Sequence, residues 1–137
     1  MKQDKTYIFR SYSLSKRLLF IKKELEKYMI IDESKKTIVI NKSIEYSECL
    51  VLEKFYQDYI VDVDGNVWLN SSSLKQLPKI LFNNVIGSFL CFDNNLISLE
   101  YSPKIVGDDF YCYDNPGRFT KDSVKKVCIV KDEIIVI

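Results

Sequence analysis

The chain has 137 residues, a length that fits one domain and does not fit a two-domain enzyme. Apolar residues make up 47% of the chain and charged residues 28%, so a buried core is expected and bulk disorder is excluded. The net charge of +1 gives no overall electrostatic reason for binding nucleic acid or an anionic membrane.

The cysteine and histidine counts argue against common catalytic and metal sites. The chain has no histidine, which is the commonest general base and the usual partner of a catalytic serine or cysteine. Its four cysteines are widely spaced and include no C-x-x-C pair, so neither a disulfide scaffold nor a zinc ribbon is indicated. They are Cys49, Cys91, Cys112 and Cys128. We therefore expect a protein that is not an enzyme and uses no metal or cofactor.

No stretch of the chain approaches the roughly 20 apolar residues of a membrane span. The charged N-terminus also lacks the apolar run and cleavage site of a secretory signal. The sequence thus predicts a cytoplasmic protein without membrane contact.

Residues 13–29 are expected to form the first helix, with Ser13 as its N-cap. Apolar side chains recur at spacings of four and three residues and make one stripe along this helix. The stripe consists of Leu14, Leu18, Ile21, Leu25 and Tyr28. It either docks within the chain or pairs with its copy in a second molecule, which would give a homodimer.

The N-terminal region is also basic. Residues 1–29 hold eight Lys or Arg against three Asp or Glu, a charge of +5. Lys16, Arg17 and Lys23 fall largely off the apolar stripe, so an alternative function is a nucleic-acid-associated regulator that uses this helix. A solvated face beside a docking stripe is the simpler interpretation, and nucleic acid is not the favoured partner.

After this helix, residues 36–41 predict a strand and residues 47–59 a second helix. No proline or glycine separates this N-terminal half from the C-terminal half of the chain. We expect residues 1–60 to form a helix-strand-helix segment that caps residues 61–137, the two making one continuous structural unit.

An internal repeat dominates the second half of the chain. Residues 85–95 (VIGSFLCFDNN) align with residues 106–116 (VGDDFYCYDNP) at an offset of 21, and residues 65–70 align with 87–92 at an offset of 22. Each unit is expected to be a short strand with a return segment that buries its apolar side only by stacking on its neighbours. The asparagines at 94 and 115 are placed to bond backbone groups where the chain turns.

Alternation along each repeated strand predicts which side chains face the core. Residues two apart share one face of a strand, so Val67 with Leu69, Phe89 with Cys91, and Phe110 with Cys112 should point inward. The intervening residues should then point outward. They form a predicted binding surface of Trp68, Leu90, Phe92, Tyr111 and Tyr113, with Asn66, Asp109 and Lys104 at its rim.

The repeats resemble the short leucine-rich-repeat proteins of tailed bacteriophages, whose units look like V-x-G-x-F-x-C-x-x-N-x-L-x-S-L-E-x-x-P. The resemblance covers about residues 60–137. It rests on Gly87, Phe89, Cys91, Asn94, Leu96, Ser98, Leu99, Glu100 and Pro103, and then on Val106, Phe110, Cys112 and Asn115. The resemblance implies a fold and a viral source, with the bacterial host cytoplasm as the location, and carries no general activity.

The end of the chain predicts a cap. Thr120 is an N-cap for a short helix through Lys126, and residues 127–130 and 133–137 flank a turn at Lys131-Asp132 and predict a closing hairpin. The expected fold is therefore mixed α/β (α+β). It is a short leucine-rich-repeat-like solenoid of about three rungs with a parallel strand ladder, an N-terminal helical cap, and a C-terminal helix plus hairpin.

The expected function is binding, with the outward aromatics anchoring a host or phage protein that the chain inhibits or modulates. The competing interpretation is that residues 1–60 fold over these aromatics and make them core. A virion or assembly component is a further alternative. Aspartates such as Asp93 and Asp114 would be ligands for calcium, but the chain lacks an EF-hand loop and turn chemistry explains them better.

Overall fold

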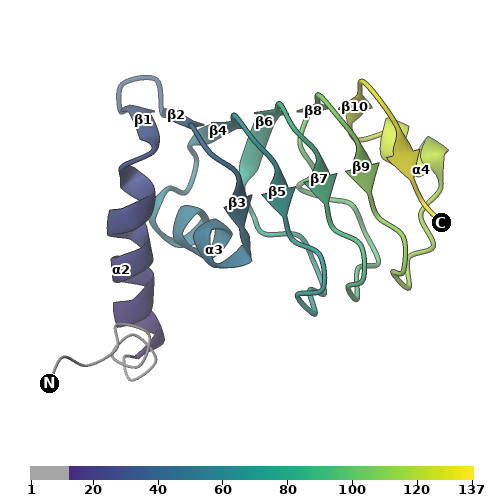
Figure 1. Cartoon of the computed structure of the whole chain (residues 1–137), viewed down its shortest axis with the longest axis horizontal. Coiled ribbons are helices and arrows are strands. Elements are labelled where there is room, and N and C mark those ends of the chain that lie inside the picture. Colours follow the sequence, from purple (N-terminus) through teal and green to yellow (C-terminus); the bar gives the residue numbers. More distant parts are fainter. Residues whose placement is uncertain (1–12) are drawn as a thin grey trace, which may run out of the picture.

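The computed structural model describes residues 13–137, which form a mixed α/β fold with helices and two mostly parallel sheets (Figure 1). The helices are α2 (Leu14–Glu26), α3 (Tyr46–Phe55) and α4 (Lys121–Lys125). The strands are β1 (Met29–Asp32), β2 (Thr37–Ile40), β3 (Ile44–Glu45), β4 (Ile60–Val63), β5 (Val67–Trp68), β6 (Leu81–Val85), β7 (Phe89–Leu90), β8 (Ile105–Val106), β9 (Phe110–Tyr111), β10 (Ile129–Val130) and β11 (Ile134–Ile135).

The strands are divided between a six-stranded sheet, ordered β1-β2-β4-β6-β8-β10, and a five-stranded sheet, ordered β3-β5-β7-β9-β11. All neighbouring strands are parallel except β1 and β2. From β2 onward the chain contributes a strand to the larger sheet and then one to the smaller, and we call each such set a strand pair. Every circuit of the chain therefore extends both sheets by one strand.

The strand register confirms the repeat alignment. Val85 lies opposite Val106 in the six-stranded sheet, and Phe89 lies opposite both Val67 and Phe110 in the five-stranded sheet. Offsets of 21 and 22 residues therefore correspond to adjacent parallel strands. Within residues 13–137 the ladder continues through β3 on one side and β11 on the other, so it is longer than the three predicted strands.

The core lies between the two sheets and contains the residues predicted to point inward. Phe89 and Phe110 are fully buried, with ring centroids 5.2 Å apart, and Cys91 and Cys112 lie beside them. Fully burying a phenylalanine ring stabilises a fold by roughly 1.5–3 kcal/mol. Repetition of the same inward residues therefore builds one continuous core from very short strands.

Asparagine side chains stabilise the corner that follows β7 and β9. The Asn94 Oδ1 accepts hydrogen bonds from the backbone N–H groups of Ser72 and Leu74, both at 3.0 Å. Its Nδ2 donates to the carbonyls of Leu69 (2.9 Å) and Cys91 (3.0 Å), which belong to successive strand pairs. The predicted role of this asparagine is confirmed, and Asn115 repeats it one circuit later.

The opposite corner, which leads into the five-stranded sheet, has its own hydrogen-bond series. Here a side-chain oxygen of one strand pair accepts the backbone N–H of the next. The Ser43 Oγ accepts from Asn66 (2.9 Å), the Asn66 Oδ1 from Ser88 (2.8 Å) and the Ser88 Oγ from Asp109 (3.2 Å). Backbones approach closely here, and a Cβ on Gly87 would lie 2.2 Å from the Asn66 Oδ1. Glycine is therefore required at this turn.

The N-terminal elements cover one end of the two sheets (Figure 1). Helix α2 has the predicted Ser13 cap but ends at Glu26, because Met29 already belongs to β1. Leu18 and Leu25 are buried within the chain and Ile21 packs against the core, whereas Leu14 and Tyr28 are exposed. The stripe Leu14, Leu18, Ile21, Leu25 and Tyr28 is thus largely used inside one molecule, which agrees with the first of its two predicted roles, docking within the chain.

Two further predictions need correction. Residues 127–130 and 133–137 do not form a hairpin, because β10 pairs in parallel with β8 and β11 pairs in parallel with β9. The strand at residues 37–40 is not confined to a cap either, because β2 and β3 extend the same sheets as the repeats. The helix predicted after Thr120 is confirmed as α4. No helix within residues 13–137 has the length and apolarity needed to cross a membrane.

We predict that Asn94→Ala destabilises the protein by about 3 kcal/mol, because it removes five hydrogen bonds and leaves buried backbone groups without partners. Urea unfolding followed by circular dichroism measures this change. The matched control is Asn95→Ala at the exposed neighbouring position, where a change within about 0.5 kcal/mol is expected. Equal losses in the two variants would contradict the corner role of Asn94.

A second prediction concerns the contact between α2 and α3. The Tyr56 hydroxyl donates to the Glu26 Oε2 at 2.6 Å, and this hydrogen bond is the main reason that the pKa of Glu26 lies below its ordinary value of 4.5. A lowered carboxyl pKa gives stability that is present above the ordinary value and is lost as the pH falls through the folded-state value. Lys22 adds an ion pair to Glu26 at 3.1 Å.

Tyr56→Phe is therefore expected to cost about 1 kcal/mol at pH 7, the low end for a charged acceptor because Glu26 is partly exposed. The difference from the unmodified protein should shrink as the pH falls below 4.5. Urea unfolding at a series of pH values tests this, with Tyr59→Phe as the control at the neighbouring ring. A difference that stays constant down to acidic pH would disprove the link to Glu26.

Candidate functional site

Strands β5, β7 and β9 bring three of the predicted surface residues into one row. Trp68 lies opposite Leu90, and Leu90 lies opposite Tyr111, in the register of the five-stranded sheet. Because the neighbouring Val67, Phe89 and Phe110 are fully buried, this row points away from the core. The predicted direction of these side chains is confirmed.

Two further rings continue this surface beyond the strand ends. Phe92 and Tyr113 stack with ring centroids 4.6 Å apart and an interplanar angle of 9°. Phe92 also makes an edge contact with Tyr111 at 6.3 Å. We call this surface the aromatic face; it consists of Trp68, Leu90, Phe92, Tyr111 and Tyr113.

The aromatic face is not covered by any of the described residues. Figure 1 shows α2 beside the β1 end of the fold and α3 near β3, whereas β5, β7 and β9 lie in front without a helix over them. Trp68 is 45% exposed, and the other four residues are partly exposed. Within residues 13–60, nothing makes these rings part of an internal core; residues 1–12 lie outside the described part of the chain.

The predicted rim residues have different locations. Asn66 and Asp109 lie at the corner that leads into the five-stranded sheet, and both use side-chain oxygens to bind the backbone of the next strand pair. Lys104 does not border the aromatic face, since it immediately precedes β8 in the six-stranded sheet. This prediction is wrong because the chain passes from one sheet to the other between Lys104 and Tyr111.

The Tyr111 hydroxyl lies in a negative environment. It donates to the Asp109 Oδ2 at 3.2 Å, while the Asp109 Oδ1 accepts the backbone N–H of Glu133 at 2.9 Å. Desolvation raises the pKa of Tyr111, and the hydrogen bond from its hydroxyl to Asp109 and the nearby carboxylates Asp108 and Glu133 raise it further. Tyr111 therefore stays a neutral hydrogen-bond donor across the physiological pH range.

Asp109 also belongs to a group of carboxylates that sequence reasoning identified only in part. One oxygen each of Asp108, Asp109 and Asp132 lie within 4.8 Å of one another. Asp132 joins this group because β11 continues the ladder after β9, whereas the predicted hairpin would have placed it in an isolated turn. Both oxygens of Asp109 already accept hydrogen bonds, so the group forms a negative border of the aromatic face.

A second exposed apolar surface, on the outer side of the six-stranded sheet, was missed in the sequence. Ile30, Ile60, Leu81 and Ile129 are each at least 42% exposed there. The sequence carries little signal for it, because Ile60, Val61 and Val63 of β4 are all apolar although only Ile60 is exposed. This surface is aliphatic and is interrupted by Asp62, whose Oδ1 accepts hydrogen bonds from Asn83 and Asn84. Because tryptophan and tyrosine are enriched among residues that dominate binding energy, the aromatic face is the stronger candidate.

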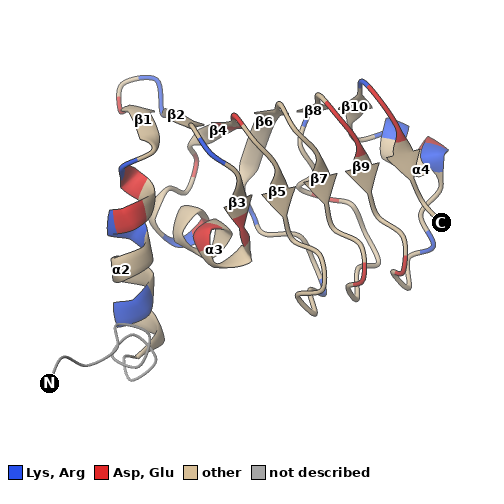
Figure 2. Cartoon of the chain, in the orientation of Figure 1, with Lys and Arg blue, Asp and Glu red and all other residues tan. Residues whose placement is uncertain are grey.

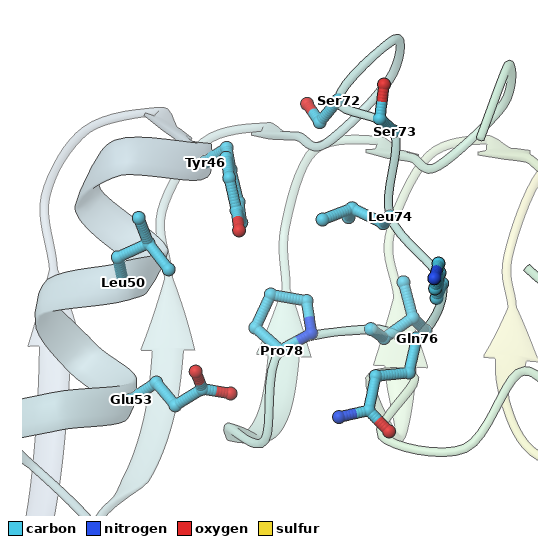
Figure 3. Close-up of a pocket in the computed structure, with 10 residues that line it drawn as sticks. Tyr46, Leu50, Glu53, Ser72, Ser73, Leu74, Gln76 and Pro78 are labelled. Carbon is cyan, nitrogen blue, oxygen red and sulfur yellow. The ribbon is translucent and has the colours of Figure 1, made fainter. Parts of the chain in front are cut away.

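A hollow of about 240 Å³ lies between α3 and residues 72–78 (Figure 3). Tyr46 and Leu50 form one wall, and Leu74 and Pro78 lie across from them. Glu53 lies at the opposite end from the serine hydroxyls, and its Oε2 accepts the backbone N–H of Lys79 at 2.6 Å. A carboxylate held in this way and separated from the hydroxyls does not activate a nucleophile, so Glu53 and the serines do not form a catalytic pair in this hollow.

Two lysines near the C-terminal end of helix α2 are paired locally. Lys27 contacts Glu24 at 3.0 Å and Lys22 contacts Glu26 at 3.1 Å. Exposed pairs of this kind contribute little stability, but they weaken the field that a phosphate backbone would meet. Burial of Leu18 and Leu25 makes α2 a packing element. The nucleic-acid alternative, which uses Lys16, Arg17 and Lys23, stays a prediction.

The four cysteines are buried free thiols. Burial raises the pKa of Cys112 to about 11 and that of Cys128 to about 12, and it also raises the pKa of Cys49 and Cys91. The thiolate is the reactive form, so none of these residues is an activated nucleophile in the folded chain.

We predict that iodoacetamide at pH 8 modifies none of the four thiols rapidly in the native protein and all of them after unfolding in urea. Mass spectrometry of samples taken over time gives the number of labelled sites. Rapid native labelling of Cys91 or Cys112 would show that the stacked core opens, and would contradict their burial.

Comparison of the chain with protein-family models, with curated proteins and with solved structures gives no match. The resemblance to phage leucine-rich-repeat proteins therefore stays a prediction from the repeat motif. The assignment of the aromatic face rests on the register and exposure of its own residues.

Proposed function

We propose that this chain is a non-enzymatic protein-interaction module that binds through its aromatic face. The observation that carries the proposal is Trp68, a large ring that is 45% exposed on a rigid strand and in register with Leu90 and Tyr111. Rigid aromatic side chains supply large contact areas at small entropic cost, and they are enriched among residues that dominate binding energy. A contiguous exposed apolar patch is typical of an interaction site.

The proposed architecture behind this function is a leucine-rich-repeat-like solenoid. Parallel strands at offsets of 21 and 22 residues, inward Phe and Cys positions, and corner asparagines all support it. Solenoid repeats present extended surfaces on which neighbouring units contribute equivalent residues. The aromatic face has this arrangement, with three successive strands contributing one outward residue each.

The proposed biological setting is a bacteriophage protein in the cytoplasm of the bacterial host, where binding inhibits or modulates a host or phage protein. The repeat motif supports this setting. A surface that blocks a partner needs affinity and shape but no chemistry, which agrees with a chain that lacks histidine and has buried, deactivated thiols.

Site-specific photo-crosslinking tests the proposal. A benzophenone amino acid placed at position 90 should capture a protein partner in bacterial cells, whereas the same group at position 81 on the other sheet should not. Truncation of Trp68 or Tyr111 to alanine should each remove about 2 kcal/mol of binding free energy, close to a 30-fold loss of affinity. Circular dichroism should show that both variants keep the fold.

Three results would refute the proposal. The first is the same set of adducts from positions 81 and 90, which would show nonspecific capture. The second is recovery of identical partners in identical amounts with the doubly substituted W68A/Y111A protein. The third is the appearance of the chain in purified virus particles with its position 90 adducts confined to structural proteins, which would favour an assembly role.

A further inference from the structure

Carboxylates border the aromatic face along both of its long edges. Asp108, Asp109, Asp132 and Glu133 lie on one edge, where the chain enters β9 and β11, and Asp93 and Asp114 lie on the other (Figure 2). Residues 80–117 contain five Asp or Glu, four of them in these borders and the fifth Glu100, against one Lys, and that lysine, Lys104, precedes a strand of the other sheet. The local charge of this region is therefore −4.

These border carboxylates have no cationic partner in the described part of the chain. The three ion pairs among residues 13–137 all involve side chains of the N-terminal elements or of residues 42–48. The borders do keep some internal hydrogen bonds, for example from Ser71 to the Asp93 Oδ2 at 2.8 Å. Their negative charge is nevertheless left for a ligand or for solvent ions to balance.

The rings between the two borders add a second preference for cations. The face of an aromatic ring is electron-rich and attracts a guanidinium or ammonium group that lies over it within about 6 Å. Phe92 and Tyr113 already stack in parallel, so a planar guanidinium placed on the free face of either ring would continue that stack. Arginine combines this stacking with forked hydrogen bonds to carboxylates, and lysine does not.

We propose that the segment recognised by the aromatic face is an extended, arginine-bearing stretch of a partner protein, with guanidinium groups over the rings and hydrogen-bonded to the carboxylate borders. This inference rests on the proposed function, and it specifies the chemistry of the partner. The same charges repel a phosphate backbone, so the inference also excludes nucleic acid from this surface.

Trp68 provides a direct reporter of binding at this face, because it is the one tryptophan in the chain. Neighbouring strands lie about 4.8 Å apart, so Trp68 is about 10 Å from the row position of Tyr111. A bound nine-residue extended peptide spans about 30 Å and would pass over Trp68 as well as the rings beyond it. Tryptophan fluorescence therefore reports whether a peptide occupies the face.

The experiment is a fluorescence titration of the full chain with three synthetic nine-residue peptides, each made of three Arg-Ser-Gly, Lys-Ser-Gly or Glu-Ser-Gly units. The arginine peptide should change Trp68 fluorescence saturably, with an affinity that falls as salt is raised. The lysine peptide should bind at least 3-fold more weakly and the glutamate peptide should give no saturable change. Equal responses to all three peptides, or no response to the arginine peptide at about 1 mM, would overturn the inference.

Variants locate the response on the face. Asp114→Asn with Asp132→Asn removes one charge from each border, and asparagine tolerates the left-handed φ of 55° at position 114. This double variant should lower the affinity for the arginine peptide about 10-fold and flatten its salt dependence. Glu100→Gln, at an exposed acid outside both borders, is the matched control and should leave the affinity unchanged.

Tyr113→Leu separates ring stacking from charge, since it keeps the apolar bulk and the borders. We expect it to reduce the preference for arginine over lysine to less than 2-fold. An arginine preference that survives this change, or a loss caused by Glu100→Gln alone, would place binding elsewhere and reject the inference.

The outcomes for the two proposals can be told apart. If position 90 captures a partner through a segment that lacks arginine, binding through the aromatic face stands and only its cationic specificity is wrong. If position 90 captures nothing but the arginine peptide still binds with the expected variant pattern, the surface recognises cations and the protein-interaction function fails. Concentration-dependent self-association that the arginine peptide abolishes would identify a second copy as the source of the cationic segment.

Discussion

The hydrogen bonds of two asparagine side chains hold successive strand pairs together, and the position of every residue on the aromatic face depends on them. Strands of the five-stranded sheet are two residues long, so the backbone ladder alone supplies few hydrogen bonds. Asn94 connects the carbonyls of Leu69 and Cys91, and Asn115 connects those of Cys91 and Cys112. Each of these amides therefore fixes one strand pair to the pair before it. At the opposite corner, the side-chain oxygens of Ser43, Asn66 and Ser88 do the same by accepting backbone N–H groups of the next strand pair. With both corners fixed, the short strands keep their register.

Much of this arrangement could be predicted from the sequence because stacking imposes a strict rule. An inward side chain on one strand must lie over an inward side chain on the next, so the offsets between Val67, Phe89 and Phe110 directly give the register. Alternation then places Trp68, Leu90 and Tyr111 on the outside without further information. The corner role of Asn94 could be predicted for the same reason, because a chain that turns through a buried position needs an amide to bond its backbone. These three inferences depend only on local periodicity and on burial, and the structure agrees with them.

The remaining features could not be predicted because the repeat length varies outside the two closest copies. Residues that lie opposite one another on neighbouring strands are separated by different numbers of residues in the sequence. The separation is 23 from β2 to β4, 21 or 22 from β4 to β6, and 24 from β8 to β10 and from β9 to β11. Helix α4 occupies the return segment of the last circuit, which is three residues longer than the 21 that separate Phe89 from Phe110. Without a constant offset, residues 127–137 look like two local strands joined by a turn, and a hairpin is the natural expectation. The misplacement of Lys104 has the same origin: the visible motif marks one strand of each circuit, and nothing in it reveals that a second sheet lies between successive copies.

Stabilisation of the sheet is the main competing explanation for the outward rings, and it accounts for some of them but not for all. Cross-strand aromatic pairs contribute roughly 0.2–1 kcal/mol, which is enough to explain the stacked Phe92 and Tyr113. Tyr111 likewise has a structural role, because its hydroxyl bonds Asp109 at the corner. Trp68 is different: within the described chain it makes no ring contact, it is 45% exposed, and it lies opposite Leu90 on one side and Glu45 on the other. A β-branched residue would serve a strand equally well at that position without exposing an indole. Since Val67 and Leu69 on either side of it already supply the core, the exposed part of the Trp68 indole is not needed there, and the proposed binding role would account for it.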